Sequence, residues 1–295
     1  MLSAIGFLVV IVAVVLGYMY HGGSLALLWQ PSEIIIILGA AIGAFLASST
    51  RYSFKQVRQN LPQIFRPKAI TKAHYEQTLA LLYTLFTKMH REGIISIEQD
   101  IENPDESPLF QSFEPVNNDT QVCAFIGDTL RTYLTTGKSD ELGELMDADI
   151  RSIKEELEVA PHSMNRLADS LPGMGIVAAV LGIVLTMDKI SLPPAELGKL
   201  IGAALLGTFL GILFCYGFFS PMAAKLENLE RERSIYFRCV REAVMGALRG
   251  LSPIIAMEYG RRSIPPEYRP SFAEMEEALK TAGATPPGEP QVEVV

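Results

Sequence analysis

Four long apolar runs without a charged residue limit what this chain can fold into. They are free of Asp, Glu, Lys and Arg and cover Leu2–Tyr20, Ile34–Ser48, Leu171–Met187 and Leu200–Pro221. Runs of about 17–25 apolar residues match the thickness of a bilayer's hydrocarbon layer when they form α-helices. The second run reaches that length only with the polar Ser49 and Thr50. A buried core helix is the alternative for each run, but four runs in a chain that is 49% hydrophobic predict four transmembrane helices.

Basic residues predict which side of the membrane each connection faces. Those that follow the second and fourth runs are Arg51, Lys55, Arg58, Arg66 and Lys68, then Lys225, Arg231, Arg233, Arg238 and Arg241. The loop 21–33 has no Lys or Arg, and the two lysines of 188–199 are offset by Asp188 and Glu196. The positive-inside rule therefore places segment 51–170 and both termini in the cytoplasm. No basic residue precedes the first run, so we expect it to be retained rather than cleaved as a signal peptide.

The polar segments have helical periodicity and no strand-like alternation. Apolar residues at helical spacing predict a helix that Gly93 ends and another that Gly137 ends. A third is expected to start at Ser139 or Asp140 and to stop before Pro161, and the segment after Pro221 is expected to continue the fourth run to Gly250. The predicted fold class is all-α: a polytopic membrane protein with four transmembrane helices and a helical cytoplasmic domain. Its expected parts are 1–50 (transmembrane helices 1 and 2), 51–170 (cytoplasmic domain), 171–221 (transmembrane helices 3 and 4), 222–280 (cytoplasmic helical extension) and 281–295 (disordered tail).

The predicted spanning helices contain no carboxylate, although a proton or sodium relay normally needs one. Either the chain transports nothing, or a partner chain supplies the acid. Small residues recur three or four apart on the third and fourth runs, and such faces let helices associate closely in lipid. They favour a partner, but simple packing of the two runs against each other explains them equally well. The residues are Gly175, Ala178, Ala179 and Gly182, then Gly202, Ala203, Ala204, Gly207 and Gly211.

Two prolines mark the expected cytoplasmic ends of the third and fourth runs. Pro172 and Pro221 are predicted to lie at the same depth, where each removes a backbone donor and loosens its helix. Ordinary helix-end prolines are the alternative, and locally the more common case. The matched depth favours a hinge or gate.

Several function classes lack any signal in the sequence. The net charge of −8 gives no basic field for nucleic acid. Three cysteines without metal-ligand spacing are expected to be reduced packing residues. No phosphate-binding loop, metal cluster or activated nucleophile is present, so we expect neither an enzyme nor a bound cofactor.

Four segments carry a resemblance to a known family. "DSLPGMGIVAAVLGIVLTM", "PPAELGKLIGAALLGTFLGILFCYGFFSPMA" and "IIAMEYGRRSIPPEYRPSFAEMEE" resemble the MotA family of flagellar motor stator subunits, as does "GIISIEQDIENPDES". The resemblance runs from Met1 to about Lys280. It implies a protein of the bacterial inner membrane. In the implied complex, five copies of the chain surround two copies of MotB, whose membrane aspartate binds the ion. It also implies that the third and fourth helices line the ion path, with Pro172 and Pro221 as the family's functional prolines.

The resemblance further implies a contact with the rotor protein FliG through the inner loop. Glu98 matches the family's acidic position, while His90 stands at the basic position with Arg91 beside it. Arg91 substitutes for the basic residue, or His90 carries part of the charge in a pH-dependent way. A solvated helix end is the alternative for all three.

The third helix also bears on which ion is used. Sodium-driven relatives place a threonine where this chain has Ala179, and Thr208 on the fourth helix offers only one hydroxyl. Because a dehydrated sodium ion needs several oxygen ligands, we expect a proton-driven stator. An energy-transducing channel subunit of the ExbB or TolQ type is the runner-up, although such chains typically have three spans. A membrane scaffold without an ion path is the third possibility.

Overall fold

The computed structural model describes residues 2–67 and 69–284, and every regular element within them is a helix. Four helices are long and apolar enough to cross a membrane, which confirms the predicted fold class. Contacts divide the chain into a first unit, residues 1–68 and 156–230, and a second unit, residues 69–155 and 231–295. Two long helices, α10 (Leu142–Met187) and α12 (Ser220–Leu248), contribute residues to both units.

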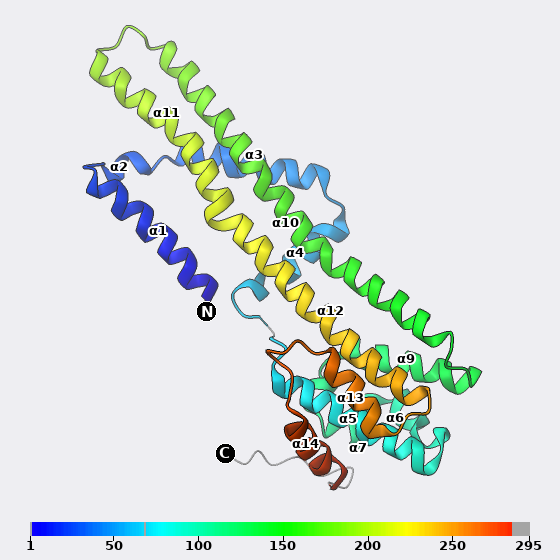
Figure 1. Cartoon of the computed structure of the whole chain (residues 1–295). Helices are drawn as coiled ribbons and strands as arrows, with labels where there is room; N and C mark the ends of the chain where they lie inside the picture. The colour runs from blue at the N-terminus through cyan, green and yellow to red at the C-terminus, as the bar shows by residue number, and fades with distance from the viewer. Residues whose placement is uncertain (1, 68, 285–295) are drawn as a thin grey trace. The chain divides into compact units, whose positions relative to one another are not determined.

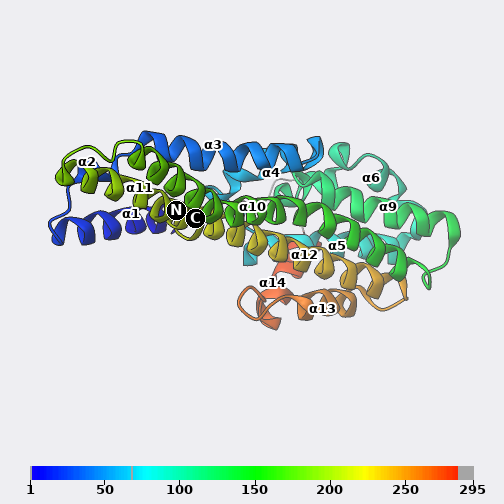
Figure 2. The ribbon, with the colours of Figure 1, turned by 90° about the horizontal axis from the view of Figure 1, so that it is seen from above.

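The first unit contains the apolar helices. Its other elements are α1 (Leu2–Tyr20), α2 (Leu25–Leu28), α3 (Pro31–Ser48), α4 (Arg51–Asn60), the short 3₁₀ helix η1 (Leu61–Ile64), α11 (Pro194–Phe214) and the π-helical turn η4 (Cys215–Phe219). Figures 1 and 2 show α10 and α11 side by side over the length of α11. Helix α3 packs against α11, and Ile37, Ala41 and Phe45 are its buried apolar residues.

Glycines bring the backbones of α10 and α11 into direct contact. A Cβ on Gly175 would lie 2.8 Å from the Gly207 carbonyl oxygen, and one on Gly211 would lie 2.7 Å from the Leu171 carbonyl oxygen. Near the other end of the pair, a Cβ on Gly182 would lie 2.6 Å from the Ala204 Cβ. Real Cβ atoms do not approach other atoms this closely, so only glycine allows the observed separation.

This contact settles what the small residues of the third and fourth runs do within one chain. They pack the third and fourth apolar helices against each other, which was the simpler of the two interpretations of the small-residue faces. Gly202 lies outside the tightest part of the contact, because a Cβ added to it would meet only a Leu27 methyl group, at 4.0 Å. Within the apolar runs of α10 and α11, large apolar side chains are exposed instead, among them Ile176, Val180, Val184, Leu205 and Ile212.

Helix α10 continues through Pro161, where the third polar helix was expected to stop. It is a single helix of 46 residues with Pro161 and Pro172 inside it. Each proline lacks the N–H that would bond to the carbonyl four residues back, which for Pro172 is the carbonyl of Ala168. Buried neighbours on both sides of Pro161, among them Ala160 and Met164, stabilise the helix across this break.

The fourth apolar helix also continues past a proline, as expected, but only after a widened turn. The Ser220 N–H donates to the Cys215 carbonyl, five residues back, which makes η4 a π-helical turn. Pro221 follows directly and has no N–H of its own. The wider turn gives the proline ring room next to the preceding carbonyls, so α11, η4 and α12 follow one another without a break to Leu248.

The second unit is built around α5 (Lys72–Glu92). Short helices follow it: η2 (Ile94–Ile97), α6 (Glu98–Glu102), η3 (Pro104–Glu106), α7 (Pro108–Gln111) and α8 (Glu114–Asn117). Then come α9 (Thr120–Thr136), α13 (Pro253–Ser263) and α14 (Phe272–Ala284), and α13 and α14 both pack on α5. The helices expected to end at Gly93 and Gly137 are confirmed as α5 and α9, and both glycines have positive φ angles, 87° and 65°.

Aromatic rings and one ion pair join α5, α9 and α12. Tyr236 is fully buried, its hydroxyl lies 2.7 Å from the Thr78 hydroxyl, and its neighbour Phe237 contacts Phe125 edge-on at 5.2 Å between centroids. Arg233 stacks over the Phe237 ring at 4.7 Å and forms an ion pair with Asp119, the N-cap residue of α9. The N-terminus of α9 is therefore held by a charge that is itself partly buried.

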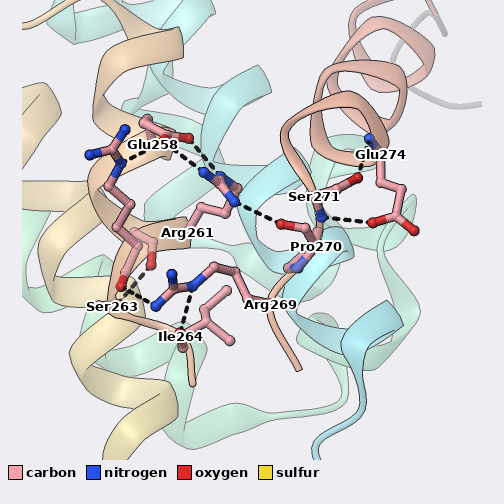
Figure 3. Close-up of polar contacts among 10 residues, drawn as sticks. Glu258, Arg261, Ser263, Ile264, Arg269, Pro270, Ser271 and Glu274 are labelled. Atoms are coloured by element: carbon pink, nitrogen blue, oxygen red, sulfur yellow. Dashed lines mark hydrogen bonds and ion pairs between the residues drawn. The ribbon is translucent and has the colours of Figure 1, made fainter. Parts of the chain in front are cut away.

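Helices α13 and α14 meet in a polar corner that is closed by arginines (Figure 3). The Arg261 guanidinium donates to the Glu258 carboxylate at 2.6 Å and to the Pro270 carbonyl at 2.8 Å. Arg261, together with Arg262, lowers the pKa of Glu258 to about 2. On α14, Glu274 accepts the Ser271 N–H at 2.7 Å and pairs with Lys72 of α5 at 2.6 Å. Of the tail expected to be disordered, 281–295, residues 281–284 end α14 and the remainder lies outside the described residues.

Gly211→Ala tests the contact between α10 and α11. The new methyl group would meet two backbone atoms, the Leu171 oxygen at 2.7 Å and the Gly175 Cα at 2.8 Å. Since backbone cannot rotate away as a side chain does, we expect a loss of about 1–3 kcal/mol in stability. The measurement is the thermal unfolding midpoint of the detergent-purified protein. Gly173→Ala on α10 is the control, because no atom lies within 4 Å of that Cβ position. Equal midpoints for the two variants would contradict the close contact.

Candidate functional site

The expected ion-path residue Ala179 lies where three helices of the first unit meet. A Cβ on Gly207 of α11 would lie 3.0 Å from the Ala179 nitrogen and 3.1 Å from the Ala178 Cβ, both on α10. The third neighbour is a carboxylate oxygen, Glu33 Oε2 of α3, at 2.9 Å from the same position. All four residues are buried.

Glu33 corrects the expectation that the spanning helices contain no carboxylate. The second apolar run begins at Ile34, but α3 begins at Pro31, and the candidate span that includes α3 extends from Leu25 to Ser48. Proline at the first position of a helix is preorganised for helical geometry, and this places Glu33 inside the first turn. Counting only uninterrupted apolar residues therefore missed the acid, which the N1 proline signal could have recovered.

Thr208 follows Gly207 on α11 and is half-buried. Another hydroxyl on the spanning helices is bonded within its own helix: the Thr186 hydroxyl donates to the Gly182 carbonyl at 2.8 Å. Within the described residues, no group of three or more His, Cys, Asp or Glu side chains converges as a metal site would require.

The two prolines are not at the same depth. Pro172 adjoins Leu171, whose carbonyl oxygen meets Gly211. Pro221 lies ten residues beyond Gly211 along α11, η4 and α12. At about 1.5 Å of rise per residue, the prolines are separated along the helix pair by about 15 Å. The expectation failed because the ends of the apolar runs do not set the register, which the glycine contacts decide. Pro172 is half-buried and Pro221 is exposed.

The candidate rotor-contact residues gather at the corner between α5 and α6 in the second unit. His90 and Arg91 lie in the last turn of α5, and Glu98 begins α6, with only Gly93 and η2 between the helices. All three side chains are exposed. Basic residues at a helix C-terminus and an acidic residue at an N-terminus are each favoured by the helix dipole, by about 0.3–1 kcal/mol. That local effect is a sufficient structural reason for their charges.

Ion pairs hold this corner in place. Asp100 of α6, which is 7% exposed, accepts from Lys88 of α5 at 2.7 Å and from the Ser107 hydroxyl at 2.6 Å. On the other side of α6, Arg131 of α9 donates to the Glu102 carboxylate at 2.8 Å and to the Ile101 carbonyl at 2.7 Å. The hydrogen bond to Glu102 is the main cause that raises the pKa of Arg131. Glu98 therefore begins a short helix whose C-terminal part, from Asp100 to Glu102, is held by these contacts.

A hollow of about 260 Å³ opens beside the same corner. His90 forms part of its wall, and the other lining residues are mostly apolar: Phe86, Met89, Ile94, Tyr133, Leu248 and Leu251. No pattern in the sequence indicated it, since its walls come from α5, α9 and the end of α12.

The cysteines occupy the packing role that their spacing indicated. Cys123, Cys215 and Cys239 are all free and buried. Burial raises the pKa of the Cys123 thiol to about 11 and that of Cys239 to about 12, which keeps both as unreactive thiols.

The paired apolar helices and the helical second unit define a multi-pass α-helical membrane protein. Residues 4–93 match the family described as motility protein A N-terminal, and residues 118–238 match the MotA/TolQ/ExbB proton channel family. The chain is 43% identical over 281 residues to motility protein A of Escherichia coli, covering 95% of each chain. It is 33% identical over 276 residues to chemotaxis protein LafT of Vibrio parahaemolyticus, covering 93% of this chain and 97% of that one. The chain belongs to the motility protein A family.

Two solved structures share the fold. The MotAB stator complex of Bacillus subtilis matches with a TM-score of 0.75 at 22% identity, over 93% of this chain and all of that one. The MotAB structure of C. jejuni matches with a TM-score of 0.76 at 17% identity, over 92% of this chain and 98% of that one.

Proposed function

We propose that this chain is a flagellar motor stator subunit that forms a proton-conducting complex with MotB and converts ion flow into torque on the rotor. The observation that carries the proposal is the identity of 43% with motility protein A of Escherichia coli over 95% of both chains. The close contact of α10 and α11 agrees with it, since a path between helices needs walls of fixed geometry.

The proposal includes an orientation and an assembly. Both termini and the second unit lie in the cytoplasm of a bacterium, and the apolar helices cross its inner membrane, as the basic residues after the second and fourth runs favour. Five copies surround two MotB chains, each of which contributes a membrane aspartate. The large exposed apolar side chains of α1, α10 and α11 suit contact with lipid or neighbouring subunits.

An ExbB- or TolQ-type role is the less favoured alternative. The proton channel family match names those proteins as well, but residues 4–93 match the family described as motility protein A N-terminal. Four candidate spans also exceed the three expected of that type.

The chain should restore swimming, together with its MotB partner, to a motility protein A deletion strain. We expect swimming speed to be independent of sodium and to be abolished by a protonophore, because Ala179 has no side-chain oxygen where sodium-driven relatives place a threonine. Speed is measured against sodium concentration at fixed pH and membrane potential. A strong sodium dependence that a protonophore leaves intact would overturn the choice of ion, while failure to restore swimming would overturn the stator role.

Charge reversal tests the corner between α5 and α6 as the surface that engages FliG. Glu98→Lys and Arg91→Glu should each reduce torque severalfold, because an attraction across an exposed interface becomes a repulsion. Membrane levels should stay at the parental value, since neither side chain is buried. Lys138→Glu, which is exposed on the loop after α9, is the control. Unchanged torque for Arg91→Glu with a loss for His90→Glu would assign the basic role to His90.

Proline replacement separates helix stability from torque. Pro172→Ala supplies the N–H that the Ala168 carbonyl lacks. We therefore expect the free energy of unfolding to rise by up to about 3 kcal/mol, with a higher thermal unfolding midpoint. If α10 must flex at this point during ion transfer, torque falls in the same variant. Pro221→Ala should behave alike. Pro161→Ala lies in α10 outside the apolar run and should raise stability with parental torque. Parental torque in both Pro172→Ala and Pro221→Ala would contradict the proposal that these two prolines form a gate.

A further inference from the structure

Glu33 is a buried carboxylate without a hydrogen-bond partner for its inner oxygen. The residue is 7% exposed, and no described atom bonds to Oε2. An unpaired charge in hydrocarbon costs several kcal/mol, so helices rarely keep such a group without a use for it. A bound proton or a visiting cation removes that cost.

The carboxylate lies at a depth where structural use of a charge is unfavourable. On α11, its neighbour Gly207 is about 10 Å of helix from Leu200, where the apolar run begins. On α10, Ala179 is about 12 Å from the end of the helix at Met187. Both distances place the carboxylate inside a hydrocarbon layer of about 30 Å and not at its surface.

The carboxylate lies where the missing side chain of Gly207 leaves space. Gly207 has no Cβ, and the position where one would stand is 2.9 Å from Glu33 Oε2. The apolar segments that pack around it, Leu171–Met187 of α10 and Leu200–Phe214 of α11, contain no Asp, Glu, His, Lys or Arg. Glu33 is thus the only residue with a charge-bearing side chain at this meeting point within the described part of the chain.

We infer that Glu33 is a second proton-accepting group of the ion path, contributed by this chain and distinct from the partner's aspartate. This rests on the proposed function. A proton from water forms an O–H bond with the carboxylate and neutralises it, and the same proton then leaves to a water molecule on the inner side. The step transfers no electrons and needs no other reactant. Its carboxylate lies against Gly207 and beside Ala179, so Glu33 of α3 reaches the pair of helices, α10 and α11, that the proposed function assigns to the path.

Glu33→Gln tests this inference in cells that express the chain with its partner. The amide keeps the size and hydrogen-bonding capacity of the side chain but cannot exchange a proton. We expect at least severalfold lower stall torque and proton influx at an unchanged membrane level, with partial recovery in Glu33→Asp. Glu196→Gln is the matched control, because Glu196 is an exposed acid in the first turn of α11. Parental torque and influx in Glu33→Gln would overturn the inference.

A chemical measurement covers the case in which Glu33→Gln fails to assemble. A hydrophobic carbodiimide reacts with protonated carboxyl groups inside membranes, and mass spectrometry of the parental complex after this treatment locates the adducts. We expect an adduct on Glu33 as well as on the partner's aspartate. Absence of the Glu33 adduct, when the partner's aspartate is labelled, would overturn the inference. If the untreated parental complex conducts no protons at all, the proposed function fails instead, so the two failures are distinguishable.

Discussion

The backbone contact between α10 and α11 is the constraint on which the rest of the first unit depends. Lipid tails are as apolar as leucine, so helices inside a bilayer gain little from the hydrophobic effect and associate through dispersion and close packing. Gly175 and Gly211 bring the two backbones to a separation that an alanine would not allow. That separation fixes the relative register of the helices, and the register decides which side chains meet.

Two positions show how far the register reaches. At Gly207 it leaves a space that the Glu33 carboxylate enters from α3, which turns an acid at the start of a helix into a buried group beside Ala179. At the prolines it separates two residues that were expected to lie together, because it places Pro172 close to the level of Gly211 and Pro221 nearly three helical turns further on, at roughly 3.6 residues per turn. A coupled hinge at one depth is therefore replaced by two separate weak points, one inside α10 and one behind the π-helical turn η4.

The second unit is stabilised by buried apolar side chains and by ion pairs at helix ends. Leu82, Phe86 and Tyr236 are buried around α5, and partly buried ion pairs such as Arg233 with Asp119 fix the ends of helices. The same logic explains the polar corner of α13 and α14, where two arginines satisfy Glu258 and a backbone carbonyl. Because Lys88 and Asp100 fix α6 in the same way, the exposed charges at the corner between α5 and α6 are presented by rigid backbone.

The sequence alone was enough to predict the helices and helix ends that depend on local chemistry. Uncharged runs predicted four spanning helices, and Gly93 and Gly137 predicted two helix ends, because glycine alone adopts positive φ without strain. Local rules failed where tertiary contacts outweighed them: α10 passes through Pro161 since its buried neighbours stabilise the helix across the lost hydrogen bond. Glu33 was missed for a different reason: the apolar run was counted from Ile34, although Pro31 marks the start of the helix. Only the tertiary structure, through the close approach of three helices at Gly207, decided where that charge is placed.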